Sequence, residues 1–205
     1  MKKYSAFAVA REALRHHTGW QRAWRDAQPK KRYDVIIVGA GNAAFCAALA
    51  ARESGATVLM LERAPQELSG GNSRFTAGAF RFAYDGLEDI RTLCPELSEE
   101  QLQITDFGSY SKDQFFDDMF RLTRFRTDPD LCETLVMKSR ETIAWMQKNG
   151  ICFIPIYGRQ AFRVDGRFKF WGGLTLESWG GGPGLIDCET ELAEKVGIEI
   201  RYGAR

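Results

Sequence analysis

The chain carries a glycine-rich turn, Gly39-Ala-Gly-Asn-Ala-Ala44, set between an apolar run and an alanine-rich stretch. The run Val35–Val38 is wholly apolar, as expected of a strand that is buried on both faces of a parallel sheet. Residues 42–54 are predicted to form a helix that stops at Gly55. Thr57–Leu61 then reads as a second strand, so the connection is expected to be a right-handed βαβ crossover. This unit restricts the chain to an α/β fold.

The spacing Gly39-x-Gly41-x-x-Ala44 matches the fingerprint of a dinucleotide-binding turn. Gly39 permits the tight turn, Gly41 leaves room for a pyrophosphate because it has no Cβ, and Ala44 lets the helix pack close to the strand. The start of the helix offers free N–H groups and the positive end of its dipole to the phosphates. The cofactor-binding residues predicted here are Gly39, Ala40, Gly41, Asn42, Ala43 and Ala44.

Glu62 lies 21 residues after Gly41, at the end of the second predicted strand. There its carboxylate can accept hydrogen bonds from both hydroxyls of an adenosine ribose, and it would repel the 2′-phosphate of NADP. Arg63 follows directly and is included in the predicted site. The alternative is a glycine turn in some other α/β fold. It is disfavoured because the strand, the helix and the acidic residue all occur in their expected places.

Beyond this unit the sequence resembles the flavoprotein family of fumarate reductases and succinate dehydrogenases, and within it the tricarballylate dehydrogenases. The resemblance covers about residues 33–205 and rests on Asp34–Ala44, Ser69–Ser73, Phe170–Gly173 and Gly180–Leu185. It implies FAD as the cofactor, with the segment Ser69–Gly78 running beneath the flavin. The additional cofactor-binding residues that it implies are Gly70, Gly71, Asn72, Ser73 and Gly78. A plain glycine-rich turn is the alternative interpretation of this segment.

The resemblance also implies a fold, a Rossmann-like FAD-binding domain of the glutathione-reductase type with a parallel central sheet. A smaller clamp domain follows later in such proteins, so we expect residues 33–205 to be an FAD-binding domain that is incomplete at the C-terminus. The implied reaction is hydride transfer to or from flavin N5, with a small di- or tricarboxylate such as tricarballylate as substrate. An electron-acceptor protein or a quinone-linked partner is compatible with this chemistry.

No catalytic residue is assigned from the sequence, because the resemblance places the family's substrate-binding and proton-transfer groups beyond position 205. Arg159, Arg163 and Lys169 lie in a region rich in glycine and aromatic residues and could face a carboxylate substrate. Solvated surface charge is the favoured interpretation of all three. We therefore expect that the 205-residue chain alone does not turn over a substrate.

Residues 1–32 form a separate N-terminal arm in this interpretation, with Trp20, Trp24 and a basic run that ends at Arg32. The arm, up to about Gly41, resembles the start of the β subunit of heterotetrameric sarcosine oxidase, a flavin-dependent enzyme with an amine substrate. Two alternative functions follow: a sarcosine-type amine oxidase subunit, or an inactive nucleotide-binding fragment that docks on a partner subunit. Exposed Trp and Arg side chains often anchor such interfaces.

Charge, apolar runs and cysteine content argue against a nucleic-acid-binding, membrane-spanning or metal-binding protein. With 28 basic and 27 acidic residues, the chain gives no electrostatic argument for nucleic acid binding. Its apolar runs are too short to span a bilayer. The five cysteines are widely spaced and the two histidines, His16 and His17, are adjacent, so we predict reduced thiols and no metal site. We predict a cytoplasmic location, with peripheral membrane association left open.

The remaining segments are predicted from local signals alone. Residues 79–105 are expected to be irregular, and Pro155 is expected to place residues 151–156 at the edge of a sheet. The other predicted elements are helices at Asp113–Thr123, Asp130–Lys148 and Ile186–Val196 and a final strand at Gly197–Tyr202.

Overall fold

The computed structural model describes residues 31–205 and divides the chain into a unit of residues 1–33 and a unit of residues 34–205. The predictions for the N-terminal arm, including Trp20, Trp24 and the histidine pair, therefore lie outside the described residues. The account that follows concerns the second unit. Within it, no helix combines the length and apolar character needed to cross a bilayer.

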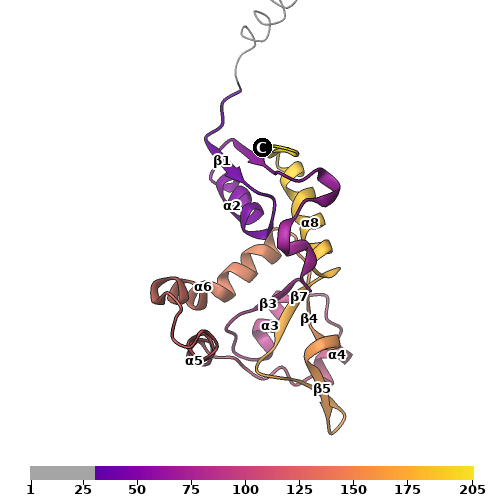
Figure 1. The fold of residues 1–205 in the computed structure, drawn as a ribbon. Helices are drawn as coiled ribbons and strands as arrows, with labels where there is room; N and C mark the ends of the chain where they lie inside the picture. The colour runs from indigo at the N-terminus through magenta and orange to yellow at the C-terminus, as the bar shows by residue number, and fades with distance from the viewer. Residues whose placement is uncertain (1–30) are drawn as a thin grey trace, which may run out of the picture. The chain divides into compact units, whose positions relative to one another are not determined.

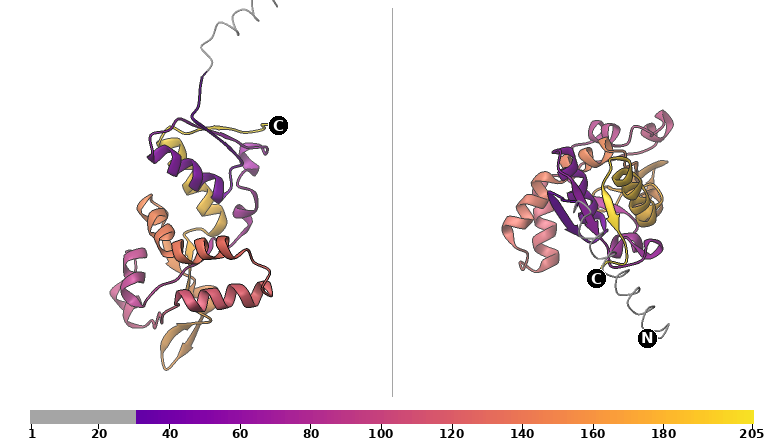
Figure 2. Two further views of the ribbon diagram at one scale, coloured as in Figure 1. Left: turned by 90° about the vertical axis from the view of Figure 1, so that its left-hand side faces the viewer. Right: turned by 90° about the horizontal axis from the view of Figure 1, so that it is seen from above.

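A parallel three-stranded sheet contains the first strands of the unit (Figure 1). Strand β1 (Val35–Val38) pairs with β2 (Val58–Leu61), which pairs on its other side with β8 (Glu199–Arg201). Helices α2 (Asn42–Glu53) and α8 (Gly181–Lys195) lie side by side against it (Figure 2). The predicted βαβ unit is confirmed, with the helix ending one residue earlier and the second strand starting one residue later than expected.

Strand β1 differs from the prediction in its burial. The side chains of Ile36 and Val38 are 60% and 83% exposed, whereas Val35 and Ile37 pack against the apolar cluster beneath α2 and α8. The expectation that Val35–Val38 is buried on both faces is therefore wrong for these residues. From β1 to β2 and from β2 to β8, the chain moves across the sheet in the same direction. Two right-handed crossovers in the same direction place their helices on the same face of the sheet. Both α2 and α8 therefore cover that face.

A second, separate sheet is antiparallel and has the order β3-β7-β4. Its strands are β3 (Ala79–Arg81), β7 (Thr175–Ser178) and β4 (Phe153–Pro155). Strand β4 lies at an edge, as Pro155 predicted, because proline has no N–H to give to a neighbouring strand. The strands β3 and β7 and the separate hairpin of β5 (Ala161–Val164) and β6 (Arg167–Phe170) were not predicted from the sequence.

Helices with strong local signals form as predicted, at α5 (Lys112–Thr123) and α6 (Pro129–Lys148). The prediction that residues 79–105 are irregular is wrong. Besides β3 they contain α3 (Leu87–Leu93) and α4 (Glu99–Gln103), and α4 starts at a capping box in which Ser98 and Gln101 bond to each other's backbone N–H. The shorter elements are the helix α7 (Tyr157–Gln160) and the 3-10 turns η1 (Gln66–Leu68) and η2 (Gly71–Phe75).

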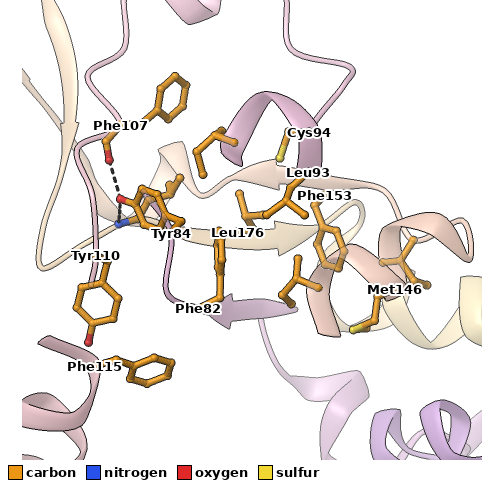
Figure 3. Packing of buried hydrophobic residues seen from close by; sticks show 14 of the residues in the cluster. Phe82, Tyr84, Leu93, Cys94, Phe107, Tyr110, Phe115, Met146, Phe153 and Leu176 are labelled. Atoms are coloured by element: carbon orange, nitrogen blue, oxygen red, sulfur yellow. Dashed lines mark hydrogen bonds between the residues drawn. The ribbon is translucent and has the colours of Figure 1, made fainter. Parts of the chain in front are cut away.

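A large apolar cluster holds the second sheet to α3, α5 and α6 (Figure 3). Leu176 of β7 lies within it, beside Phe82 and Phe153. The buried Tyr84 hydroxyl donates to the carbonyl oxygen of Phe107 at 2.6 Å and accepts from the N–H of Leu174 at 3.0 Å. This hydroxyl satisfies two buried backbone groups at once, which fixes the loop before β7.

Candidate FAD-binding site

The N-terminus of α2 lies above the carboxyl end of β1 and is open to an anion. Gly39 has a φ of +107°, which favours glycine, and its N–H donates to the carbonyl oxygen of Leu61 at 2.8 Å. The N-cap residue is Gly41, which has no side chain to cap the first turn, and that turn carries no acidic residue. Because the first N–H groups of a helix have no partner within it, this end presents donors and a positive dipole end.

The segment Ser69–Gly78 crosses this helix end. A Cβ built on Gly41 would lie 3.4 Å from both the carbonyl oxygen of Gly70 and the Oγ of Ser73. The N–H of Asn42 donates to that Oγ at 3.2 Å. Two segments that the sequence predicted separately therefore meet at the first turn of α2. The space above Gly41 is available only while this residue lacks a large side chain.

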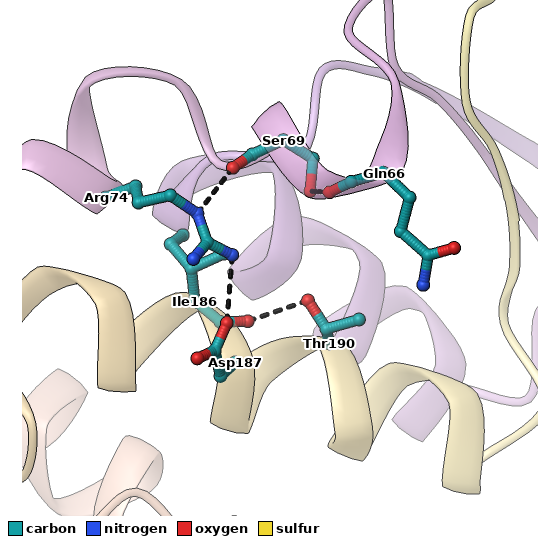
Figure 4. A network of polar contacts seen from close by, with 6 residues as sticks. All are labelled: Gln66, Ser69, Arg74, Ile186, Asp187 and Thr190. Carbon is teal, nitrogen blue, oxygen red and sulfur yellow. Dashed lines mark hydrogen bonds and ion pairs between the residues drawn. The ribbon is translucent and has the colours of Figure 1, made fainter.

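Helix α8 also packs against the segment Ser69–Gly78. The guanidinium group of Arg74 donates to the carbonyl oxygen of Ser69 at 2.7 Å and to the carboxylate of Asp187 at 2.9 Å (Figure 4). A Cβ on Gly70 would lie 2.9 Å from the side chain of Ile186. Sequence reasoning missed Arg74 and Asp187, although Arg74 directly follows the Gly-Gly-Asn-Ser motif. Their ion pair holds the predicted cofactor loop against the helix.

Gly78 is buried at the junction between this segment and the second sheet. Its φ is +64°, and a Cβ would overlap the Ser178 side chain and the backbone of Gly181. Its carbonyl oxygen accepts from the N–H of Ser178 at 2.8 Å. Because Gly78 is buried among these groups, it is needed for the packing of the segment on the second sheet. Gly71 and Asn72, in contrast, are exposed. A direct FAD contact by Gly78 stays a prediction.

Glu62 lies where the sequence placed it, immediately after β2. One carboxylate oxygen accepts from the N–H of Ala64 at 2.7 Å, which fixes the half-buried side chain. Its backbone is held on both sides, by the carbonyl oxygen of Arg201 at 2.8 Å and the N–H of Ala204 at 2.9 Å. Arg63 beside it is exposed. The carboxyl ends of parallel strands are where open α/β sheets bind their ligands.

A buried carboxyl group lies behind the first turn of α2, and it was not predicted from the sequence. Glu189 of α8 is 1% exposed, and one of its carboxyl oxygens has no partner among the described residues. Desolvation raises its pKa to about 8. The thiol of Cys46, which lies 3.9 Å from Glu189 and 3.5 Å from the Asn42 side-chain oxygen, has its pKa raised to about 12, mainly by burial and then by Glu189. Both groups are therefore neutral around pH 7.

Two of the three cations considered as carboxylate ligands have partners within the protein. Lys169 is paired with Asp106 at 3.2 Å, and this lysine holds the pKa of the Asp106 carboxyl below its usual range. The Arg163 guanidinium stacks over the ring of Phe168 at 4.5 Å in the β5–β6 hairpin, while Arg159 lies in α7. Within residues 31–205, no three His, Cys, Asp or Glu side chains come together to hold a metal ion.

A helix N-terminus above parallel strands, crossed by a glycine-rich segment, is the arrangement of a dinucleotide-binding domain. Residues 34–200 match the protein family described as "FAD binding domain", and the chain belongs to that family. FAD is therefore its cofactor, as the sequence predicted, and the Rossmann-like fold class is confirmed.

Two relatives of the chain are fumarate reductases. A probable fumarate reductase of Shewanella frigidimarina is 30% identical over 180 residues, which are 87% of this chain and 27% of the relative. The open conformation of a flavocytochrome c3 fumarate reductase is 25% identical with a TM-score of 0.59, over 91% of this chain and 29% of that one. The predicted resemblance to the fumarate reductase and succinate dehydrogenase flavoproteins is thus confirmed, while the particular likeness to tricarballylate dehydrogenases stays a prediction.

A third relative matches only the N-terminal region. The β subunit of sarcosine oxidase from Rhodobacter capsulatus is 69% identical over 42 residues, which are 20% of this chain and 10% of that subunit. This confirms the resemblance that the arm showed in the sequence. The chain spans less than a third of the length of each of these three proteins.

Proposed function

We propose that residues 33–205 form the FAD-binding part of an oxidoreductase that acts on a small di- or tricarboxylate such as tricarballylate. The observation that carries this proposal is the meeting of the α2 N-terminus with the segment Ser69–Gly78, joined by the hydrogen bond from Asn42 to Ser73. When bound, FAD would supply hydride transfer through its N5 atom. The chain's own residues would bind and orient the cofactor.

The residues of the site have distinct proposed tasks. The N–H of Ala43 would face the pyrophosphate beside Asn42, whose own N–H is held by the Ser73 hydroxyl, with Gly39, Ala40, Gly41 and Ala44 keeping the backbone close to it. Glu62, held by the N–H of Ala64, would accept from the ribose hydroxyls, with Arg63 beside it. Gly70, Gly71, Asn72, Ser73 and Gly78 would line the flavin side.

The substrate class comes from the relatives. Two of them are named as fumarate reductases, and fumarate is a small dicarboxylate. Among the cations considered for such a substrate, Lys169 is paired with Asp106 and Arg163 stacks over the ring of Phe168. We therefore propose that the 205 residues supply the nucleotide end of the site and do not by themselves turn over a carboxylate. An electron-acceptor protein or quinone-linked partner, in the cytoplasm or at a membrane surface, fits this proposal.

A second candidate is a subunit of a sarcosine-type amine oxidase. It is favoured by the 69% identity of 42 N-terminal residues to a sarcosine oxidase β subunit. In this candidate, residues 1–32 act as a docking arm for a partner subunit. A third candidate is an inactive nucleotide-binding fragment, which would bind FAD and dock through the arm but would catalyse no reaction.

Absorbance and turnover measurements distinguish these candidates. Purified full-length chain is expected to show flavin bands or to acquire them when FAD is added, and well-folded protein that binds no FAD would contradict the proposed site. Assays with tricarballylate, succinate and sarcosine, using an artificial electron acceptor, are expected to show no turnover by this chain alone. Measurable turnover would mean that a complete active site lies within residues 33–205, and the substrate that reacts would select between carboxylate and amine chemistry.

A further inference from the structure

A cavity of about 680 Å³ lies at the start of α8, where the turn after α6 meets strands β4 and β7. It contains none of the residues assigned to FAD. Its lining includes the thiols of Cys152 and Cys188, the side chain of Trp179 and the turn residue Gly150. Trp179 is 70% exposed, so the cavity opens at the surface.

The two thiols converge on one backbone atom. The Sγ of Cys188 lies 3.6 Å from the carbonyl oxygen of Gly150, and the Sγ of Cys152 lies 4.0 Å from the same oxygen. Cys152 comes from the segment before β4, and Cys188 from α8, 36 residues later. Burial raises the pKa of the Cys188 thiol, and the neighbouring Cys152 raises it further. The sulfurs are therefore close neighbours although their positions in the sequence are distant.

The other three cysteines are in different surroundings. Cys94 and Cys132 are each 1% exposed within the apolar cluster of the second sheet. Cys46 is enclosed between α2 and α8, beside the carboxyl group of Glu189. Cys152, in contrast, is exposed, and Cys188 is half-buried beside it. Exposure favours reaction of a thiol, because the thiolate that attacks must meet its reagent.

We propose that Cys152 and Cys188 are a redox-active dithiol that reacts with small aliphatic disulfides and closes to an intrachain disulfide at this cavity. The Cys152 thiolate attacks one sulfur of the small disulfide and releases the other half as a thiolate. The Cys188 thiolate then attacks the Cys152 sulfur and releases the second half. The protein loses two hydrogens and is oxidised, while the small disulfide is reduced to two thiols.

The resulting bond would join the turn at Gly150 to α8. Gly150 has a φ of +103°, and its turn connects the end of α6 to β4. Both sulfurs lie within 4.0 Å of the carbonyl oxygen of Gly150, on the two segments that the bond would join. The proposal is independent of the proposed FAD function, because none of its groups belongs to the cofactor site.

Peptide mapping of the full chain tests the proposal. Trypsin places each of the five cysteines in a different peptide, with Cys152 in residues 149–159 and Cys188 in residues 170–195. Reduced protein is incubated with glutathione disulfide, and free thiols are then blocked. The expected result is a mass loss of two hydrogens and a cross-link between these two peptides. A stable glutathione adduct on Cys152 without a cross-link, a link to another cysteine, or no modification would overturn the proposal.

Single variants supply the controls. Cys188→Ser is expected to stop at the glutathione adduct on Cys152, because the second thiol is missing, and Cys152→Ser is expected to abolish the cross-link. Cys132→Ser, a matched change at a buried thiol, should leave the cross-link intact. A cross-link that survives in Cys188→Ser or is lost in folded Cys132→Ser would contradict the assignment. Circular dichroism of each variant establishes that it is folded.

Discussion

The hydroxyl oxygen of Ser73 lies 3.2 Å from the backbone nitrogen of Asn42 and accepts its N–H. This hydrogen bond joins two segments that are 31 residues apart and lies at the N-terminus of α2. A serine hydroxyl is both acceptor and donor, so its proton stays available to an anion at the same place. Ser73 therefore aligns the glycine-rich segment with the helix end, and we predict that it contributes to FAD binding at this place.

Replacing Ser73 with alanine should weaken FAD binding about tenfold or more, because a hydrogen bond to a charged group contributes ~1.5–3 kcal/mol. Titration of apoprotein with FAD, followed by flavin fluorescence, measures the change. Ser54→Ala removes a hydroxyl at the opposite end of α2 and should leave the dissociation constant unchanged. Equal dissociation constants for Ser73→Ala and wild type would remove Ser73 from the cofactor site.

Replacing Gly41 with valine should abolish FAD binding. A Cβ at this position would lie 3.4 Å from two oxygen atoms. The two methyl groups of valine would extend further, into the place proposed for the pyrophosphate. The matched control is Gly158→Val, since a Cβ on Gly158 meets nothing within 4 Å. Folded Gly41→Val protein that retains stoichiometric FAD would show that the pyrophosphate does not approach this turn.

Replacing Glu62 with alanine should weaken FAD binding while the fold persists. Up to two hydrogen bonds from the ribose hydroxyls to a carboxylate are lost, each worth ~1.5–3 kcal/mol before water compensates. Glu67→Ala, an exposed change in η1, is the control. Isothermal titration with FAD provides the affinities, and an affinity equal to that of wild type would exclude Glu62 from ribose recognition.

Replacing Glu189 with glutamine should flatten the pH dependence of stability. Burial raises the pKa of Glu189 to about 8 from 4.5, so the folded state holds a proton that the unfolded state releases between these values. The free energy of unfolding of the wild type should therefore fall as pH rises through this interval, by up to about 1.4 kcal/mol per pH unit. Glutamine keeps the shape and cannot ionise.

Urea denaturation across the same pH interval provides the comparison for Glu189. The control is Glu191→Gln, which removes an exposed carboxyl group from the same helix. Its free energy of unfolding should depend on pH as that of the wild type does. A Glu189→Gln variant whose stability falls with pH as steeply as that of the wild type would show that Glu189 is already ionised in the folded protein.

The parts of the fold that were predicted correctly carry their signals within a few residues. The glycine turn at Gly39 and Gly41 marks the start of α2, and Asp128 followed by Pro129 marks the start of α6. The strands β3 and β7 have no such signal. Ala79 pairs with Glu177, 98 residues away, so each strand is defined by a distant partner. Likewise, α8 begins at Gly181, before the start that was predicted at Ile186. Gly182 is required there, since a Cβ would overlap the carbonyl oxygens of Ser73 and Thr76.

The sequence by itself determined the βαβ unit and the acidic residue at the end of β2, because these depend on local spacing and on the absence of a Cβ at particular positions. The choice of FAD came from the resemblance of its motifs to those of flavoproteins. Only the tertiary structure decided that Ser73 meets Asn42, that Arg74 is held by Asp187, and that Glu189 is buried beside Cys46. It also decided that Cys152 and Cys188 face the same carbonyl oxygen. Each of these pairs joins segments that lie far apart in the chain. Their proximity follows from how α2 and α8 pack on one face of the sheet, and a local pattern of residues does not contain that packing.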